Sequence, residues 1–452
     1  MGQKVLTVFF VALLIRLLFL FILSWHGYGQ DFWLSGDTGG YVGIAQNLAT
    51  HGVYSSDSIG LVPENHRPPL YPLFLVPFVV SNSSVLVVGF VQNVLVSSAA
   101  VFLYVLGRKV FRESVAFGAA LVFAIEPAGA LLSNVLMSEA LFVFFFVPAI
   151  FFLVLFIHTQ KNTHLFFASA SLALASLTRA IAFYFVFLIP LAVLLACGKK
   201  IPWRATLVGL CVFYLVVSPW LVFNLVTFSS LQFSSTANIN LYKDNVVQFE
   251  RWLYPEKEPF FDSPENIKII LGGDEGINRA ERAAKLGKAA RDFILDHAFK
   301  YSVFHALYMP RLFIHDGYVY LYESLSGGKT SFSSIPLYHD LVTLNLGTLR
   351  EKITHTPSIL VPFFPKLFFV GISFLAFLHL FLSWKKEEKQ MRKVSLFLVG
   401  FVLVYAFLVS PVGQERLRFV IHPVLFLLAL DSLRILKEKY NFRFRLLDRV
   451  RV

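Results

Sequence analysis

Five short polar segments of the sequence place charged residues beside a long apolar run. Ionised side chains next to membrane spans are costly, which makes them candidate site residues: a carboxylate can exchange protons, and a guanidinium can bind phosphate. In the first segment, Asp37, Tyr41 and Ala45 recur every four residues and so share one face of a short helix. The alternative for Asp37 is that it only caps the N-terminus of that helix.

The second segment is His66-Arg-Pro-Pro-Leu-Tyr-Pro72. Its paired prolines are expected to hold the backbone extended and rigid, with Arg67 at a fixed depth near the lipid headgroups. A guanidinium there can bind a phosphate through two parallel hydrogen bonds, which lysine cannot do. The alternative is a stiff turn whose arginine is solvated by lipid. Glu64 and His66 are possible ligands of a divalent metal, but two ligands one residue apart are a weak signal.

The third segment brackets a brief turn and contains Glu126-Pro127 and Ser138-Glu139. Glu139 opens an apolar run, where the positive end of a helix stabilises a carboxylate. A capping role and a functional role therefore explain Glu139 equally well. The fourth segment is Thr178-Arg179, which places a cation in the tightest external hairpin of the chain.

The fifth segment, Gln414-Glu-Arg-Leu-Arg418, comes immediately before the last apolar run. Arg416 and Arg418 fall on the external side of the predicted topology, against the bias of basic residues toward the cytoplasm. We expect an anionic lipid phosphate or a carboxylate such as Glu415 to hold them there. Arg16 lies in the middle of the first apolar run and is expected to find its partners inside the bundle.

Long apolar runs must position these residues. The 452-residue chain is 56% apolar and 15% charged, whereas a soluble domain is about 45–50% apolar even with glycine included, and about 25% charged. This much apolar surface exceeds what one soluble core can bury, but it suits spans of about 20 residues. The sequence therefore predicts an all-α polytopic membrane protein with about ten spans, and up to twelve, near residues 5–25, 84–106, 115–133, 139–157, 165–178, 180–197, 205–225, 359–384, 394–411 and 419–436.

The order of these runs divides the chain into three parts. The first is an N-terminal transmembrane core (1–225), which includes a first external loop (26–83). The second is a large external loop or small subdomain (226–358), and the third consists of C-terminal spans with a basic tail (359–452). We expect both termini in the cytoplasm, because an alternating count then retains there the clusters of Lys and Arg between spans. Both large loops then lie outside.

The large external loop is predicted to be helical in part. Turn signals at Asp262-Ser-Pro264 and Gly272-Gly273 precede a helix-like run over residues 277–295. Residues 299–322 are aromatic but interrupted by proline and charged residues, so we expect an interfacial amphipathic helix rather than a span. Whether this stretch crosses the membrane is left open by the sequence.

The formal charge of +12 does not indicate nucleic-acid binding, because the basic residues cluster in short segments between apolar runs. Anionic membrane lipids are the expected counterions. The two cysteines, Cys197 and Cys211, sit in or beside apolar runs, so no disulfide is expected to close the large loop.

Taken in order along the chain, these motifs resemble the GT-C glycosyltransferases of the glycosyltransferase family 39 type, which include protein O-mannosyltransferases and aminoarabinose transferases. The matching elements are Asp37 with Tyr41 and Ala45, Arg67-Pro-Pro-Leu-Tyr-Pro72, Ser138-Glu139, Leu177-Thr-Arg179, Pro219-Trp220 with Asn224, and Arg416-Leu-Arg418 followed by Pro423. Two positions depart from the family: Phe223 replaces an arginine before Asn224, and Thr38 follows Asp37 where a second acidic residue is frequent.

The resemblance implies a GT-C helical bundle that moves a sugar from a polyprenyl-phosphate donor to an acceptor hydroxyl outside the cytoplasm, with inversion at the anomeric carbon. It implies Asp37 as the general base and Glu139 as a catalytic residue that orients the acceptor, or a divalent metal if one binds; no cofactor is certain. The implied substrate-binding residues are Tyr41, Arg67, Tyr71, Arg179, Asn224, Arg416 and Arg418, with the arginines as phosphate ligands.

Two other functions remain open from the sequence. An O-antigen-ligase-like transferase also joins lipid-linked glycans with a large external loop, but relies on external arginine and histidine rather than on Asp37. A lipid or solute transporter is the non-enzymatic alternative, and the lack of a convincing internal repeat argues against it. The resemblance alone suggests the prokaryotic inner membrane; the sugar and the acceptor, whether lipid, glycan or protein, are not disclosed.

Overall fold

A computed structural model describes residues 2–25, 37–198, 202–273, 279–314, 363–386, 389–411 and 415–440, together with Gly347 and Glu351. These residues form helices and connecting turns, with no strand among them. The first part of the first loop (26–36), residues 315–322 of the stretch considered as a crossing, most of residues 323–358 and the tail beyond residue 440 lie outside the described residues.

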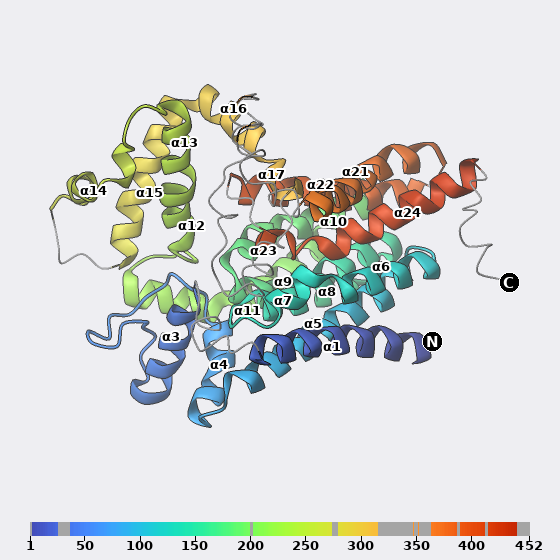
Figure 1. The fold of residues 1–452 in the computed structure, drawn as a ribbon, viewed down its shortest axis with the longest axis horizontal. Coiled ribbons are helices and arrows are strands. Elements are labelled where there is room, and N and C mark those ends of the chain that lie inside the picture. The colour runs from blue at the N-terminus through green and yellow to red at the C-terminus, as the bar shows by residue number, and fades with distance from the viewer. Residues whose placement is uncertain are drawn as a thin grey trace.

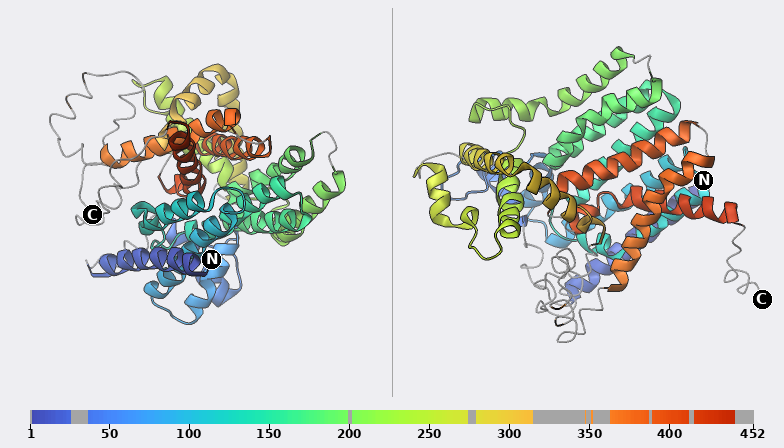
Figure 2. Two further views of the ribbon diagram at one scale, coloured as in Figure 1. Left: turned by 90° about the vertical axis from the view of Figure 1, so that its right-hand side faces the viewer. Right: turned by 90° about the horizontal axis from the view of Figure 1, so that it is seen from above.

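Long helices run roughly side by side through the body of the molecule (Figures 1 and 2). Seven of the described helices are long and apolar enough to cross a membrane by length and composition. Every predicted run that the structure describes is helical, which confirms the all-α polytopic membrane architecture. The bundle helices are α1 (Gly2–Trp25), α5 (Val85–Gly107), α6 (Glu113–Ile125), α8 (Glu139–Thr159), α9 (Asn162–Thr178), α10 (Leu188–Cys197), α11 (Trp203–Phe228), α21 (Phe363–Lys386), α22 (Lys389–Val409) and α24 (His422–Tyr440).

Helix α8 is central to the bundle, because it packs against α5, α9, α10 and α22 and is buried along most of its length. The predicted run over residues 115–133 is broken into α6 and a short α7 (Pro127–Leu132). The break has a local cause: the residue before a proline is disfavoured in helical conformation, and Glu126 is extended, with φ −64° and ψ 119°. The run over residues 180–197 likewise begins as a 3₁₀ helix, η1 (Ala180–Phe187).

Arg16 lies in α1 and is fully buried, as expected for a residue with partners inside the bundle. Its guanidinium donates hydrogen bonds to the carbonyl oxygens of Ala12, at 3.0 Å, and of Ala124, at 2.9 Å. Ala124 belongs to the last turn of α6, whose carbonyls lack partners within the helix. Arg16 therefore stabilises the end of α6 at the break, which is a structural role.

The first external loop contains two helices, α3 (Thr38–His51) and α4 (Leu70–Val80). Tyr41 and Ala45 are buried on one face of α3, as the spacing of four predicted. The expectation that the paired prolines hold the backbone extended is wrong at Pro69, which is in the helical region with φ −79° and ψ −22° as the N-cap of α4. Proline is well tolerated at the start of a helix, where its missing N–H needs no partner.

A helical subdomain projects from one end of the bundle (Figure 1). It comprises α12 (Thr236–Asn240), η2 (Leu241–Val246), α13 (Val247–Leu253), η3 (Phe260–Asp262), α14 (Pro264–Leu271), α15 (Arg279–Asp296) and α16 (Ala298–Tyr308). The short α17 (Arg311–Ile314) follows and packs against α21 of the bundle. A small core of its own, including Tyr242, Phe261 and Leu286, joins η2, α13, η3, α14 and α15, and a second cluster packs α13 against α16. The predicted turns agree with the structure: α14 begins at Pro264, and Gly272 ends it in the left-handed region with φ 79°.

Helix α16 covers much of the aromatic stretch 299–322. It has 11 residues, so it extends for roughly 16 Å, about half the thickness of a bilayer's hydrocarbon core. Alone it is too short to span. The expectation of a non-spanning helix is therefore compatible with the part of the stretch that the structure describes.

The two large loops meet at the same end of the bundle. The Ser234 hydroxyl donates a hydrogen bond to the carbonyl oxygen of His66, at 2.6 Å, and Arg279 forms an ion pair with Glu64. The N-terminus of α1 lies at the opposite end of the molecule (Figure 1). This arrangement is the one expected if both loops lie outside the cytoplasm, and the sidedness itself stays a prediction.

Candidate active site

Asp37 lies immediately before α3 and faces two arginines that come from distant parts of the chain. Its carboxylate oxygens accept hydrogen bonds from Arg67, at 3.5 Å, and from Arg416, at 3.2 Å. Although Asp37 occupies the N-cap position, its side chain makes no capping hydrogen bond. The capping alternative is therefore wrong, and the carboxylate is turned toward the arginines instead.

The charge state of Asp37 follows from these neighbours. Burial raises the pKa of its carboxyl, but the positive charges of Arg416, Arg67 and Arg179 outweigh this effect and hold the pKa below its ordinary value. Asp37 is therefore ionised at neutral pH.

Arg67 is held between α3 and the start of α4. Its guanidinium lies over the ring of Tyr41, 5.2 Å from the ring centre, and forms a second ion pair with the buried Glu64, at 3.5 Å. Glycine at position 40 permits this approach, because a Cβ atom there would collide with the guanidinium. The prolines that follow Arg67 start α4 and so fix the point from which its side chain extends.

Arg179 and Glu139 form a pair where α9 ends and α8 begins. Glu139 is the first residue of α8 and is almost fully buried, and its carboxylate contacts the Arg179 guanidinium. Arg179 also donates to the Ser138 hydroxyl, at 3.4 Å, and this hydroxyl shares a hydrogen bond of 3.1 Å with Tyr41. Glu139 therefore acts on Arg179, and through it on the pocket, rather than facing the pocket directly.

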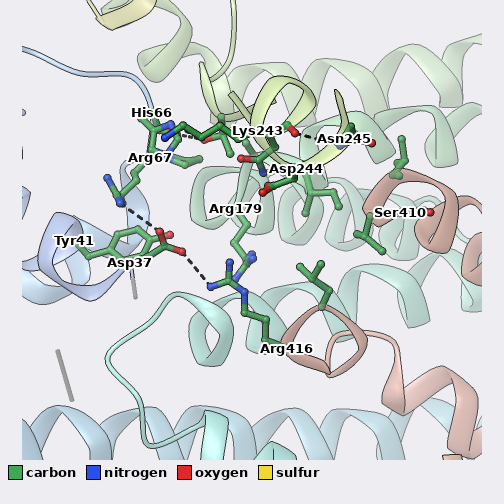
Figure 3. Close-up of a pocket in the computed structure, with 18 residues that line it drawn as sticks. Asp37, Tyr41, His66, Arg67, Arg179, Lys243, Asp244, Asn245, Ser410 and Arg416 are labelled. Carbon is green, nitrogen blue, oxygen red and sulfur yellow. Dashed lines mark hydrogen bonds and ion pairs between the residues drawn. The ribbon is translucent and has the colours of Figure 1, made fainter. Parts of the chain in front are cut away.

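Asp37, Tyr41 and the three arginines around them line a pocket of about 330 Å³ between the bundle and the external subdomain (Figure 3). Its lining contains four cations and two carboxylates: Arg67, Arg179, Lys243, Arg416, Asp37 and Asp244. One wall of the pocket is apolar. It comes from η1, α22 and the segment before α24, through Ala180, Ile181, Leu408, Val409 and Leu417. The pocket therefore offers a cationic surface beside an apolar one.

The sequence did not single out the contribution of the subdomain to this pocket. Lys243 and Asp244 come from η2, and Thr236 comes from α12. His66 also lines the pocket, where burial and the charge of Arg67 lower its pKa to about 4, so it is neutral. No motif marks these residues; adjacent opposite charges on a short polar helix are the only signal, and such pairs are common on solvated surfaces.

Three predicted substrate-binding residues do not line the pocket. Tyr71 is buried beneath Tyr41, and its hydroxyl donates to Gln92, at 2.7 Å. Asn224 donates to the carbonyl oxygens of residues 232 and 233, and so holds the turn that follows α11. Both positions favour a supporting role over contact with a substrate.

Arg418 is also outside the pocket, two residues after Arg416. It is fully buried, with its guanidinium 3.7 Å from the centre of the Phe369 ring and 3.1 Å from His422. Residues two apart on a helix point about 200° away from each other. Arg416 and Arg418 of α23 (Glu415–Arg418) therefore face nearly opposite sides, and both cannot line one pocket. The position of Arg418 therefore argues against the predicted phosphate contact.

The residues around Asp37 do not suit a divalent metal. Both of its carboxylate oxygens already face guanidinium groups, whose charge opposes a second cation. Glu64 is bound to Arg67 and Arg279, and in the part of the chain that the structure describes no group of three His, Cys, Asp or Glu side chains comes together.

Comparison with known proteins agrees with the architecture. Residues 66–223 match the family described as dolichyl-phosphate-mannose-protein mannosyltransferase; this segment contains Arg67, Glu139 and Arg179 but neither Asp37 nor Arg416. No curated protein matches the chain by sequence.

Solved structures similar to this chain include an oligosaccharyltransferase and ArnT, each in a form with a lipid phosphate bound. The oligosaccharyltransferase AglB from Archaeoglobus fulgidus, in complex with an inhibitory peptide and a dolichol-phosphate, matches with a TM-score of 0.53 and 15% identity, over 99% of this chain and 52% of its own. The transferase ArnT from Cupriavidus metallidurans, bound to undecaprenyl phosphate, matches with a TM-score of 0.43 and 14% identity, over 96% of this chain and 78% of its own. The chain thus spans about half the length of AglB.

At this level of identity the likeness to AglB concerns the fold. Together with the match over residues 66–223, it confirms the resemblance that the motifs indicated. The chain is a polytopic membrane protein with the GT-C glycosyltransferase fold, and its segment 66–223 matches the protein mannosyltransferase family.

Proposed function

We propose that this protein is a membrane glycosyltransferase that moves a sugar from a polyprenyl-phosphate donor to a hydroxyl group of an acceptor outside the cytoplasm. The observation that carries the proposal is the position of Asp37: an ionised carboxylate between Arg67 and Arg416, in a pocket with an apolar wall. A base and a phosphate-binding surface are the two parts that such a transfer needs.

The reaction follows from these parts. A carboxylate oxygen of Asp37 takes the proton of the acceptor hydroxyl group while the oxygen of this hydroxyl group attacks the anomeric carbon of the sugar. The bond between the anomeric carbon and the phosphate oxygen breaks, and its electron pair stays on the phosphate. Attack from the face opposite the leaving group inverts the anomeric configuration. The phosphate leaves as a stable anion, so no second carboxylic acid is required, unlike in glycoside hydrolysis.

The arginines supply the electrostatic part of this proposal. Cations fixed beside a departing phosphate stabilise the charge that develops on it, which is frequently the largest contribution to catalysis. The pocket lining has two more cations than carboxylates, and this excess suits a phosphate anion. A bound phosphate would also compete with Asp37 for Arg67 and Arg416, and so free a carboxylate lone pair for the proton.

The apolar wall suits the lipid part of the donor. Leu408 and Val409 lie at the end of α22, where the membrane span meets the pocket, so a lipid chain can run along the bundle while its phosphate reaches the arginines. Two of the similar structures contain dolichol-phosphate or undecaprenyl phosphate, and we extend this ligand class to the present chain. The prokaryotic inner membrane, with both termini in the cytoplasm, is the location that fits the proposal.

Two alternatives make different demands on the same residues. An O-antigen-ligase-like transferase would need the external arginines but not Asp37. A transporter would move its substrate across a sealed vesicle and would keep this activity with asparagine at position 37, unless transport is coupled to protons. The paired arrangement of Asp37 with Arg67 and Arg416 favours the glycosyltransferase.

The test is a transfer assay with purified protein in detergent. The protein is incubated with radiolabelled undecaprenyl-phosphate sugars and with membrane extracts as the source of acceptor. We expect label to move from the donor to an acceptor and unlabelled undecaprenyl phosphate to be released. Retention of all label on the donor across the panel, together with substrate movement in sealed vesicles, would replace this proposal with the transporter.

A further inference from the structure

The η2 segment (Leu241–Val246) brings a second set of charged groups to the pocket, opposite the membrane bundle. It is a π-helical turn, a rare conformation that is found preferentially at functional sites. Lys243, Asp244 and Asn245 all line the pocket from this turn. Figure 3 shows Asp244 and Arg416 on opposite sides, with Arg179 between them.

Packing on its other side holds the η2 turn in place. Tyr242 is buried against Phe261, with the ring centres 5.5 Å apart. Asn245 accepts a hydrogen bond from the hydroxyl of Tyr301, at 3.0 Å, and donates one to the carbonyl oxygen of Asn240, at 3.2 Å. The turn is therefore anchored to α12 and α16, and it presents its charged side chains from a supported position.

The hydrogen-bonding capacity of Asp244 is unused within the described chain. No ion pair or hydrogen bond joins its carboxylate, or the ammonium group of Lys243, to another described residue, whereas Asp37 is held by two arginines. Asp244 is half-buried, and burial raises its pKa, with the charges of Arg416 and Lys243 opposing this only in part. A ligand that donates hydrogen bonds would compensate for the lost hydration of this carboxylate.

The chemistry of that ligand follows from the two charged parts of the pocket, which are the arginines on one side and the η2 turn on the other. Under the proposed function, the phosphate of the donor binds the arginines, so the group next to it is the sugar. One carboxylate and one ammonium group give the η2 turn no net charge. A charged sugar would be attracted by one of these two groups and repelled by the other, so the pair offers it no net electrostatic gain to offset the loss of its hydration. The hydroxyl groups of a neutral sugar can donate hydrogen bonds to Asp244 and accept them from Lys243.

We propose that the η2 turn is the sugar subsite of the pocket, where Asp244 accepts and Lys243 donates hydrogen bonds to the hydroxyl groups of an uncharged pentose or hexose. This inference rests on the proposed function and narrows its donor to neutral sugars. It gives the external subdomain a part in sugar recognition that is separate from phosphate binding.

The experiment compares binding of two probes to the full-length protein in detergent: undecaprenyl phosphate, which lacks a sugar, and undecaprenyl-phosphate mannose, glucose or galactose. We expect Asp244→Asn to weaken binding of the best neutral-sugar donor by about tenfold or more, as for loss of a hydrogen bond to a charged group. Binding of undecaprenyl phosphate should be unchanged, which also shows that the variant is folded. Arg416→Ala should weaken binding of both probes.

Matched variants make the result specific. Asp292→Asn removes an exposed carboxylate from α15 in the same subdomain and should leave both affinities as in the wild type. Lys243→Met, at an exposed side chain, should repeat the selective loss for the sugar-bearing probe even if Asp244→Asn does not fold. Undecaprenyl-phosphate aminoarabinose and undecaprenyl-phosphate glucuronic acid should bind the wild type less tightly than the best neutral donor.

Three results would overturn this inference. The first is that Asp244→Asn weakens the binding of both probes equally, and the second is that neither η2 variant loses affinity for either probe. The third is that a charged-sugar donor binds more tightly than the neutral ones. Each result would remove the neutral-sugar subsite, but phosphate binding that depends on Arg416 would leave the proposed function standing. A wild-type protein that binds no undecaprenyl phosphate would instead remove the proposed function, and the subsite with it.

Discussion

The pocket around Asp37 can be compared with a buried polar cluster formed by Glu126, His422 and Arg418. Both contain carboxylate and cationic or polar side chains, but in different surroundings. In the pocket, the side chains of Asp37 and Arg416 are 43% and 29% exposed. In the cluster, Glu126 and His422 lie 3.5 Å apart and are 2% and 1% exposed. Among the residues that the structure describes, Asp37 and Arg416 line a pocket, whereas Glu126 and His422 are buried.

The Glu126 cluster has structural tasks that account for its contacts. The carboxylate of Glu126 accepts hydrogen bonds from the backbone N–H groups of Ala128, at 2.9 Å, and of Gly129, at 2.6 Å, and so caps α7. Arg418 donates to the carbonyl oxygen of Leu312, at 3.3 Å, and thereby ties α17 to the segment before α24. Buried charges of this kind hold the bundle together at its break, whereas those in the pocket remain open to a ligand.

The largest expected effect on activity comes from the carboxylate of the pocket, Asp37. Asp37→Asn should lower sugar transfer by about 10²–10⁴-fold, because the amide cannot take the acceptor proton. Its near-identical shape should leave expression and thermal stability unchanged. The measurement is the rate of transfer from the active undecaprenyl-phosphate sugar; wild-type turnover in Asp37→Asn would overturn the assignment of the base.

The second contrast concerns Arg418 in the buried cluster. Arg418→Ala should destabilise the protein by about 2–5 kcal/mol, since it leaves a cavity and a buried carbonyl without its donor. Thermal unfolding in detergent measures this loss, with Arg416→Ala as the control that should unfold at nearly the wild-type temperature. Equal stability of the two variants would contradict the division between a structural and a functional arginine.

Arg416 should show the opposite behaviour in kinetics. Arg416→Ala should raise the apparent KM for the donor by roughly tenfold, and more than it lowers turnover, because it removes a charged hydrogen bond to the phosphate. Steady-state rates at varied donor concentration give both constants. An unchanged KM would take Arg416 out of the phosphate site.

The smallest expected effect is a shift in pH dependence. Asp37 has a lowered pKa, so it stays ionised as the pH falls until that value is reached, and kcat/KM should be lost only in acid. Arg416→Gln removes one of the charges that lower this pKa, so the acid limb of kcat/KM should move to higher pH. Profiles of the two proteins, each measured over its stable pH range, provide the test; coincident acid limbs would show that Arg416 does not set the ionisation of Asp37.

Local sequence was sufficient to predict the helices and the pocket residues that come from the first loop and the bundle. Apolar runs and turn residues placed the spans, and the spacing of Asp37 and Tyr41 predicted the shared face of α3. Local sequence could not distinguish Arg416 from Arg418, because both precede the same span. Only the rotation of a short helix directs Arg416 into the pocket and Arg418 into the core. That rotation depends on tertiary packing.

Long-range contacts account for what the sequence left out. Asp244 reaches the pocket only because the subdomain folds back over the first loop, through Ser234 and His66, which are 168 residues apart. The break at Glu126 had a local signal in Pro127, yet the apolar composition around it favoured an unbroken span. Composition thus predicted the membrane region well, and the pocket between the two external parts needed the fold.

The most direct test of the account is an experimental structure of the protein with undecaprenyl phosphate bound. We predict that the phosphate lies within hydrogen-bonding distance of the Arg416 guanidinium, beside Arg67 and the Asp37 carboxylate, with its lipid chain along the wall that contains Leu408 and Val409. A phosphate found elsewhere on the molecule, with Asp37 still held by both arginines, would contradict the central claim.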